Sequence, residues 1–165
     1  MPNLKEVYDK CHKDGFVINL QGKINKEKVR KMLLLIESNK EIAEKSMKDA
    51  DENSITWNTI YNLHYDIIRE LAEAFLVFDS VKILNHKCLF AYLCNNHPEL
   101  ELDWEFFEKV RKNRNGINYY GQLVSYKDFK EVKVQLNLYP AILKKEIEKK
   151  LVISEQSDKE EEGNY

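Results

Sequence analysis

The chain has 165 residues, of which 43% are hydrophobic and 33% charged, and these values suit one domain with a single hydrophobic core. Its 5 glycines and 3 prolines are too few for many tight turns, so the composition predicts an all-α protein. The formal net charge of -2 excludes proteins that coat nucleic-acid duplexes through bulk positive charge, and no apolar run reaches the ~20 residues of a membrane span.

Residues 1–23 are expected to form an N-terminal extension. A short helix is predicted near residues 2–14, ended by Gly15, and the segment "FVINL" at 16–20 follows as an extended connector without a partner strand. Cys11, Cys88 and Cys94 make an odd set without a C-x-x-C pair, and no apolar stretch near the start resembles a signal peptide. We therefore expect reduced thiols in a cytoplasmic protein, with the two later cysteines serving as small buried hydrophobes.

An up-and-down bundle of four to five helices is predicted over residues 24–151. Apolar residues recur at three- and four-residue steps from Ile24 to about Ala50, and this pattern predicts the first long helix. The second runs to about Phe78, and either Ser54 or Thr56 can cap its start. Its apolar stripe is wide enough to contact two neighbours, so we place it at the centre of the bundle.

Three further helices and a tail complete the predicted organisation. One helix covers about 83–95, the next begins after the capping residue Asp103, and the last covers 127–150 with a kink at Pro140. The final twelve residues contain five acids and one lysine, so the tail over 152–165 is expected to be disordered. The rest of the chain then has a charge of only +2, and any contact with RNA must be local.

The stretch "RKNRNGINYYG" at 111–121 places a cation where the fourth helix of the bundle should present a hydrophobe. At ~100° per residue, with Val110 as zero, Arg114 falls near +40°, inside the apolar arc. Arg111 and Asn118 follow along one flank of that arc. A buried guanidinium requires an acceptor, because its desolvation is costly and its pKa is too high for it to lose the proton.

Three kinds of partner for Arg114 are open at this point. Glu70 or Asp66 of the second helix could pair with it inside one subunit. A group across a subunit interface could do so instead, as could the phosphate of a ligand.

Two stretches of the chain resemble the HEPN family, compact helical bundles found in nucleotide- and RNA-directed systems. "FDSVKILNHKCLFAYL" at 78–93 resembles the family's third-helix segment, and "VRKNRNGINYYG" at 110–121 resembles its signature. That signature is an arginine, then Asn or Asp, three further residues and a histidine, often with a tyrosine two places on. Arg114 and Asn115 match it, whereas Tyr119 replaces the histidine and Gly121 the later tyrosine. The resemblance covers roughly residues 25–150.

The resemblance implies a homodimer, because active family members are endoribonucleases whose site forms across two subunits. A phenol has a reference pKa of about 10 and is a poor general base at pH 7, so Tyr119 predicts weak or absent cleavage. Among the other histidines, His64 is interpreted as an interior residue and His86 as a partner of a loop or a helix cap.

Our leading hypothesis is a dimeric HEPN-type domain that binds a nucleotide or an RNA end at the subunit interface. Its candidate residues are Arg114, Asn115 and Tyr119 in the catalytic positions of the motif, with Arg111, Asn118 and Tyr120 as nucleotide- or RNA-binding side chains. One alternative is a toxin-type, metal-independent endoribonuclease, in which another tyrosine or a histidine from elsewhere transfers the proton. Another is a module that binds a protein partner, such as the nucleotidyltransferase of a toxin–antitoxin pair. No cofactor, metal site or membrane contact is expected.

Overall fold

Helices form where the apolar periodicity predicts them, and they assemble into an all-α bundle with one two-stranded sheet. The computed structural model describes residues 2–162, with side chains as far as Ser157. In chain order the elements are α1 (Leu4–Lys13), β1 (Val17–Asn19), α2 (Lys26–Asp49), α3 (Thr56–Leu76), β2 (Val81–Ile83), α4 (His86–Asn96), the 3₁₀ helix η1 (Pro98–Leu100), α5 (Trp104–Tyr120) and α6 (Tyr126–Glu162). Within residues 2–162, no helix is both long and apolar enough to cross a membrane.

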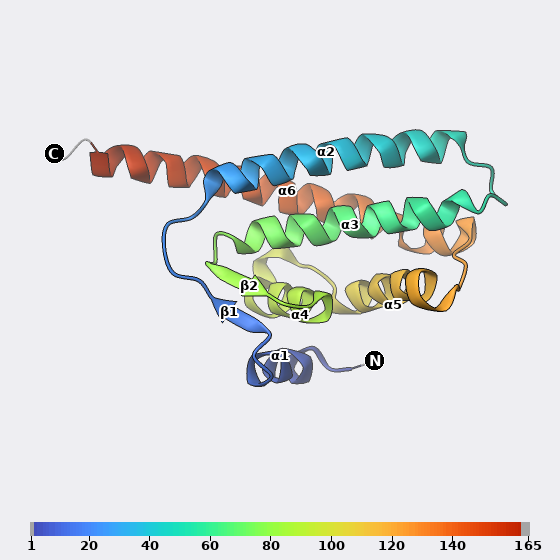
Figure 1. Ribbon diagram of the computed structural model, residues 1–165, viewed down its shortest axis with the longest axis horizontal. Helices are drawn as coiled ribbons and strands as arrows, with labels where there is room; N and C mark the ends of the chain where they lie inside the picture. The colour runs from blue at the N-terminus through green and yellow to red at the C-terminus, as the bar shows by residue number, and fades with distance from the viewer. Residues whose placement is uncertain (1, 163–165) are drawn as a thin grey trace.

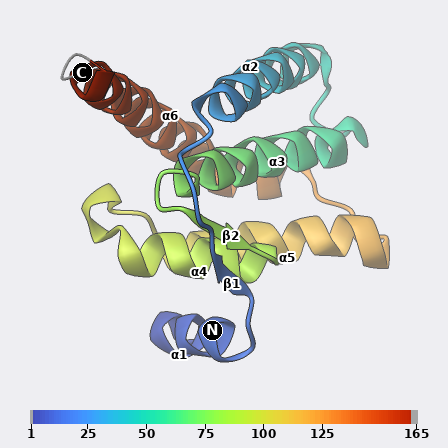
Figure 2. The same ribbon diagram turned by 60° about the vertical axis from the view of Figure 1, so that its left-hand side comes forward.

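Helix α3 lies at the centre of the bundle, as its wide apolar stripe predicts. Ile60, Tyr61, Tyr65 and Ile68 have no exposed surface, and each buried side chain of this size stabilises the fold by about 1.5–3 kcal/mol. Helices α2 and α6 pack on one side of α3, and α4 and α5 pack on the other (Figure 1, Figure 2). The central helix therefore contacts both layers.

The segment at 16–20 is a paired strand, so the prediction of an unpartnered connector is wrong. β1 pairs antiparallel with β2, with Val17 opposite Ile83 and Asn19 opposite Val81. Because β2 uses these residues, the following helix begins at His86 and not at Ile83. The N-terminal extension is thereby joined to the bundle between α3 and α4.

A disulfide between Cys11 of α1 and Cys88 of α4 reinforces that junction. The prediction of reduced thiols is wrong for these two residues, whereas Cys94 is a free buried cysteine, as expected. Burial raises the pKa of the Cys94 thiol to about 12, so it is an inert hydrophobe at neutral pH. A cytoplasmic location stays a prediction, and this disulfide does not favour it, since such bonds are rare in the cytosol.

Helix α5 begins and ends as its sequence indicates. The Asp103 carboxylate accepts a hydrogen bond of 2.8 Å from the backbone N–H of Glu105, which confirms the predicted cap. The helix ends at Gly121, whose φ of 62° lies in the left-handed region that glycine adopts without steric cost. The sharp turn there places the loop before α6 against the start of α3, where Val124 N–H donates to Asn58 Oδ1 at 2.7 Å.

Helix α6 is longer than its apolar periodicity predicts. It continues without a break through Pro140, where the predicted kink stays a prediction, and it runs to Glu162. The structure therefore differs from the expected disorder over 152–162, while residues 163–165 lie outside the described part of the chain. Contacts with α2 accompany this extension: Arg30 pairs with Glu155, and the Lys26 ammonium donates to the backbone carbonyl of Ser154.

Candidate functional site

Arg114 lies in the last turns of α5 and reaches the central helix. Its side chain is half-buried, and its Cζ lies 5.6 Å from the ring centre of Tyr65, a residue of α3 with no exposed surface. The ring of Tyr119 lies at 5.9 Å, and Arg114 Nη1 donates a long hydrogen bond of 3.5 Å to the Tyr119 hydroxyl. Aromatic faces attract a cation by about 0.5–2 kcal/mol, but they do not neutralise its charge.

Asn118, one turn after Arg114, supplies the other polar contact. When its amide oxygen faces the guanidinium, that oxygen accepts hydrogen bonds from Arg114 Nε at 3.0 Å and Nη1 at 3.3 Å. In the opposite orientation the same oxygen accepts from Asn62 Nδ2 at 3.0 Å. We favour the first orientation because it pairs a charged donor with an acceptor. Arg114 is then held entirely by neutral groups of its own chain.

The acids that could have paired with Arg114 inside one subunit are engaged elsewhere. Asp66, Glu70 and Glu73 all contact Arg69 of the same helix, at 3.4, 3.0 and 2.8 Å. Burial opposes the charge of Arg69, but its three carboxylate partners outweigh that effect and raise its pKa. Pairing of Arg114 with Glu70 or Asp66 is therefore wrong, and no carboxylate within the described residues forms an ion pair with Arg114.

Arg111 is also neutralised within the chain. Its Nε donates to Glu108 Oε1 at 2.7 Å and its Nη2 to Glu108 Oε2 at 3.2 Å. Glu108 is only 1% exposed, so this two-pronged contact is a buried ion pair within α5. The predicted role of Arg111 in binding phosphate is therefore not supported by its contacts, because Nε and Nη2 already donate to Glu108, which neutralises the charge.

The remaining candidate residues differ in how they relate to Arg114. Tyr119 and Tyr120 are 70% and 76% exposed, and of the two only Tyr119 turns toward the guanidinium. Asn115 is half-buried, and its side chain has no hydrogen bond within residues 2–162. The structure thus brings together Arg114, Asn118 and Tyr119, while Asn115 and Tyr120 flank them.

Two residues that the sequence analysis did not select complete the surroundings of Arg114. The hydroxyl of Tyr65 and Nδ1 of His86 are 2.9 Å apart, so His86 bonds a side chain of α3 and not a loop or a cap. Burial lowers the pKa of His86, and the nearby charges of Arg69 and Arg114 lower it further. Burial also raises the pKa of Tyr65 far above that of an exposed phenol. His86 is thus a neutral imidazole at pH 7.

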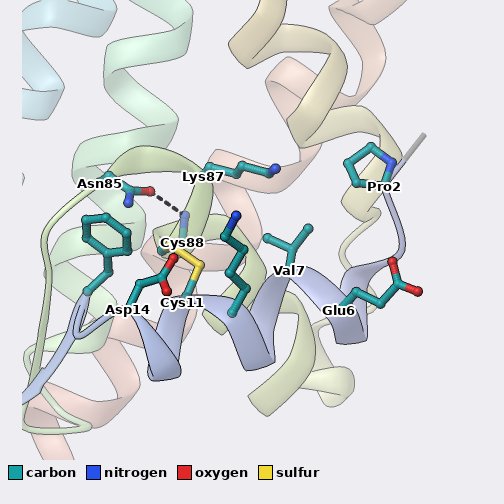
Figure 3. A pocket seen from close by; sticks show the side chains of 10 residues that line it. Pro2, Glu6, Val7, Cys11, Asp14, Asn85, Lys87 and Cys88 are labelled. Atoms are coloured by element: carbon teal, nitrogen blue, oxygen red, sulfur yellow. Dashed lines mark hydrogen bonds between the residues drawn. A yellow bond between two sulfur atoms is a disulfide. The ribbon is translucent and has the colours of Figure 1, made fainter.

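The first turn of α4 presents its side chains in two directions. Asn85, Lys87 and Cys88 line a cavity of about 390 Å³ beside α1, into which the disulfide also faces (Figure 3). His86 does not line that cavity and bonds Tyr65 instead. The residues around Arg114 and the cavity around the disulfide are therefore separate places on the molecule. No group of three or more potential metal ligands gathers anywhere in the described part of the chain.

Comparison with models of protein families, with curated proteins and with solved structures found no match. The HEPN assignment accordingly depends on the two quoted stretches of sequence. The contacts described for Arg114 do not depend on the HEPN assignment.

Proposed function

We propose that this chain is a dimeric HEPN-type domain that binds a nucleotide or an RNA end through Arg114. The observation that carries the proposal is the difference between Arg114 and its neighbours. Arg69 and Arg111 have carboxylate partners, whereas among the described residues Arg114 contacts only an amide, a hydroxyl and two aromatic rings. A half-buried guanidinium cannot lose its proton, so its charge is available to an anion. A phosphate group matches its forked donors.

The charge around the site favours a single phosphate over a long nucleic-acid backbone. Arg114 has no carboxylate partner among the described residues, and the acids around Arg69 would repel further phosphates. The exposed faces of Tyr119 and Tyr120 are available for stacking on a base, and the free amide of Asn115 adds a hydrogen-bonding group. A nucleotide or the end of a single strand fits this combination better than a duplex.

Exposed apolar side chains at the end of the bundle where α5 ends support the dimer. Tyr119, Tyr120 and Leu123 are 70%, 76% and 71% exposed, and Ile55 at the start of α3 is 70% exposed. These four residues, which we name the end patch, lie where α5 ends and α3 begins, at one end of the bundle (Figure 1). Exposed apolar patches of this kind mark interaction surfaces. A second copy seated on the end patch would bring two copies of Arg114 toward one ligand.

The binding role can be tested by fluorescence anisotropy with a labelled, 5′-phosphorylated single-stranded RNA. Arg114→Ala should weaken binding by roughly 10- to 100-fold, the worth of a charge-assisted hydrogen bond, and Arg114→Lys should be intermediate. The slope of log K against log salt should become shallower by about 0.7 for the phosphate contact that is lost. Arg30→Ala, which removes a surface arginine paired with Glu155, is the control. Equal affinities for wild type and Arg114→Ala would refute the proposal.

A second candidate function, binding to a protein such as a nucleotidyltransferase, is favoured by a different surface. Helix α2 exposes Leu34 and Leu35 at 72% and 65% of their area, with Ile42 at 51%. Copurification from the native host should then recover a second protein in a stoichiometric amount. This partner should be lost from the Leu34→Glu variant and should still copurify with the Arg114→Ala variant. Recovery of the chain alone would exclude this candidate.

A further inference from the structure

A cavity of about 380 Å³ lies where α2, α3 and α6 meet, in the layer of the bundle away from α4 and α5 (Figure 1, Figure 2). Its wall is largely apolar and comes from all three helices, with Ile36 of α2, Ile67 and Leu71 of α3, and Leu136 and Pro140 of α6. The volume falls within the range of about 300–1,000 Å³ that is typical of small-molecule sites. None of the residues around Arg114 lines this cavity.

One polar side chain, His64 of α3, is set into the apolar wall. It is 6% exposed, and neither of its ring nitrogens has a hydrogen bond within residues 2–157. Its neighbour Phe129, with 5.2 Å between the ring centres, is apolar. Nε2 is fully enclosed, so Nδ1 is the nitrogen that a molecule in the cavity can reach. A buried polar group without a partner points to a further hydrogen-bonding group at this place.

Pro140 leaves a second polar group in the wall without its usual partner. Proline has no backbone N–H, so the carbonyl of Leu136, four residues earlier in α6, loses the donor that a helix normally supplies. Leu136 and Pro140 both line the cavity. A hydrogen-bond acceptor is thus freed in the turn of α6 that forms part of the wall.

The charged side chains that line the cavity pair with one another. Lys144 of α6 donates to Glu37 of α2 at 2.7 Å, and this contact lowers the pKa of the Glu37 carboxyl and raises that of Lys144. Lys40 lies 3.9 Å from carboxylate oxygens of both Glu37 and Glu44. The two cations and two acids among the described lining residues therefore balance. A charged molecule would lose its hydration here without gaining an uncompensated counter-charge.

We propose that this cavity binds a small, uncharged molecule with an apolar body and a hydroxyl group, and that the hydroxyl hydrogen-bonds Nδ1 of His64. Burial keeps the imidazole neutral at pH 7, because it lowers the pKa of His64 to about 4. A hydroxyl both donates and accepts, so it suits Nδ1 in either tautomer. Water is a poorer occupant, because a buried water needs about two to four polar partners and this wall is largely apolar. The site does not involve Arg114, so the inference is independent of the proposed function.

Equilibrium dialysis at pH 7 with 2-naphthol and naphthalene tests the proposal, since the two probes share a ring system and only 2-naphthol has a hydroxyl. Wild type should bind 2-naphthol, and its preference for 2-naphthol over naphthalene should be roughly tenfold greater than that of His64→Leu, the worth of one hydrogen bond. His12→Gln, which removes an exposed histidine of α1, is the matched control and should keep the wild-type preference. Arg114→Ala should keep it as well. Equal preferences in wild type and His64→Leu, or no binding of 2-naphthol to wild type, would overturn the proposal.

Two further measurements locate the probe and do not depend on how His64→Leu folds. Ala141 is an exposed residue of α6 that lines the cavity, so Ala141→Trp should fill the space and abolish binding of both probes. Val134→Trp adds the same side chain at an exposed position of α6 outside the cavity and should bind like wild type. In ¹⁵N NMR spectra of wild type, 2-naphthol should shift the Nδ1 resonance of His64 more than naphthalene does. Unweakened binding to Ala141→Trp, or equal shifts with the two probes, would also overturn the proposal.

Discussion

Arg114 differs from its two neighbouring arginines for a reason that is visible in the local sequence. Side chains three or four positions apart meet on a helix, and Arg69 has acids at both of these spacings, while Arg111 has Glu108 three residues before it. Arg114 has no acid at either spacing. Its place inside the apolar arc and its lack of a local partner could therefore be predicted. Its contacts with Tyr65 and the proximity of His86 could not, because they depend on how three helices pack.

The Arg111–Glu108 pair provides a stability prediction at this scale. Glu108→Gln should lower the free energy of unfolding by roughly 2 kcal/mol, because it leaves a largely buried guanidinium without its counter-charge. Urea denaturation at pH 7 measures the change. Glu131→Gln, which breaks the exposed pair with Lys109, is the control and should cost less than about 1 kcal/mol. Equal losses in the two variants would show that Glu108 contributes no more than a surface acid.

His64 makes the protein sensitive to acid. Its Nε2 is buried without a hydrogen-bond partner in the described structure, and burial lowers its pKa to about 4, with Lys133 adding to the effect. Below pH 6.5 the unfolded chain binds a proton at this residue that the folded chain does not. The free energy of unfolding therefore decreases as the pH is lowered from 6.5 to about 4. The interpretation of His64 as an interior residue is confirmed by its 6% exposure.

Replacing His64 tests this linkage. Wild type should lose roughly 2 kcal/mol more between pH 7 and pH 5 than His64→Leu does, in urea unfolding at both values. His12→Gln should retain the wild-type dependence, because His12 is exposed. The same pH dependence in wild type and His64→Leu would contradict the assignment of a depressed pKa to this histidine.

At the scale of elements, long periodic segments were predictable and short pairings were not. Helices α2, α3 and α5 have one clear apolar face each, which fixes their type and approximate limits. The strands β1 and β2 have three residues each, so their sequences carry no pattern that identifies a partner. Ile83 is apolar and suits a helix or a strand equally well. The disorder predicted for the far end of α6 is wrong because an acidic composition is typical of a disordered tail, whereas contacts with α2 hold the preceding turns of this helix.

The disulfide gives a prediction at the same scale. Reduction should lower the free energy of unfolding by about 2–4 kcal/mol, because the bond closes a long loop between cysteines with a sequence separation of 77 and restrains the unfolded chain. Thermal unfolding with and without dithiothreitol measures the effect as a lower Tm in the reduced protein. Cys11→Ser is the control and should be insensitive to the reductant. An unchanged Tm in reduced wild type would mean that the pairing of β1 with β2 and the packing of α1 suffice without the bond.

At the scale of the whole molecule, the end patch and Arg114 occupy one end of a nearly neutral bundle. The formal charge of -2 gives no long-range attraction for nucleic acid, so the binding that we propose would have to come from the few residues around this cation. The class of fold followed from composition and periodicity, but an interface between copies leaves no such pattern. The dimer is proposed from the resemblance and from the exposure of Tyr119, Tyr120 and Leu123.

Sedimentation velocity of a labelled, 5′-phosphorylated RNA, followed at the wavelength of the label, tests dimerisation and binding in one measurement. The labelled RNA should sediment as a complex with two protein chains. With Arg114→Ala the RNA should sediment alone, while the protein, followed separately by its own absorbance, should remain a dimer. RNA that sediments alone in the presence of wild type, or with a single chain, would contradict the account of Arg114 as a phosphate-binding residue at a subunit interface.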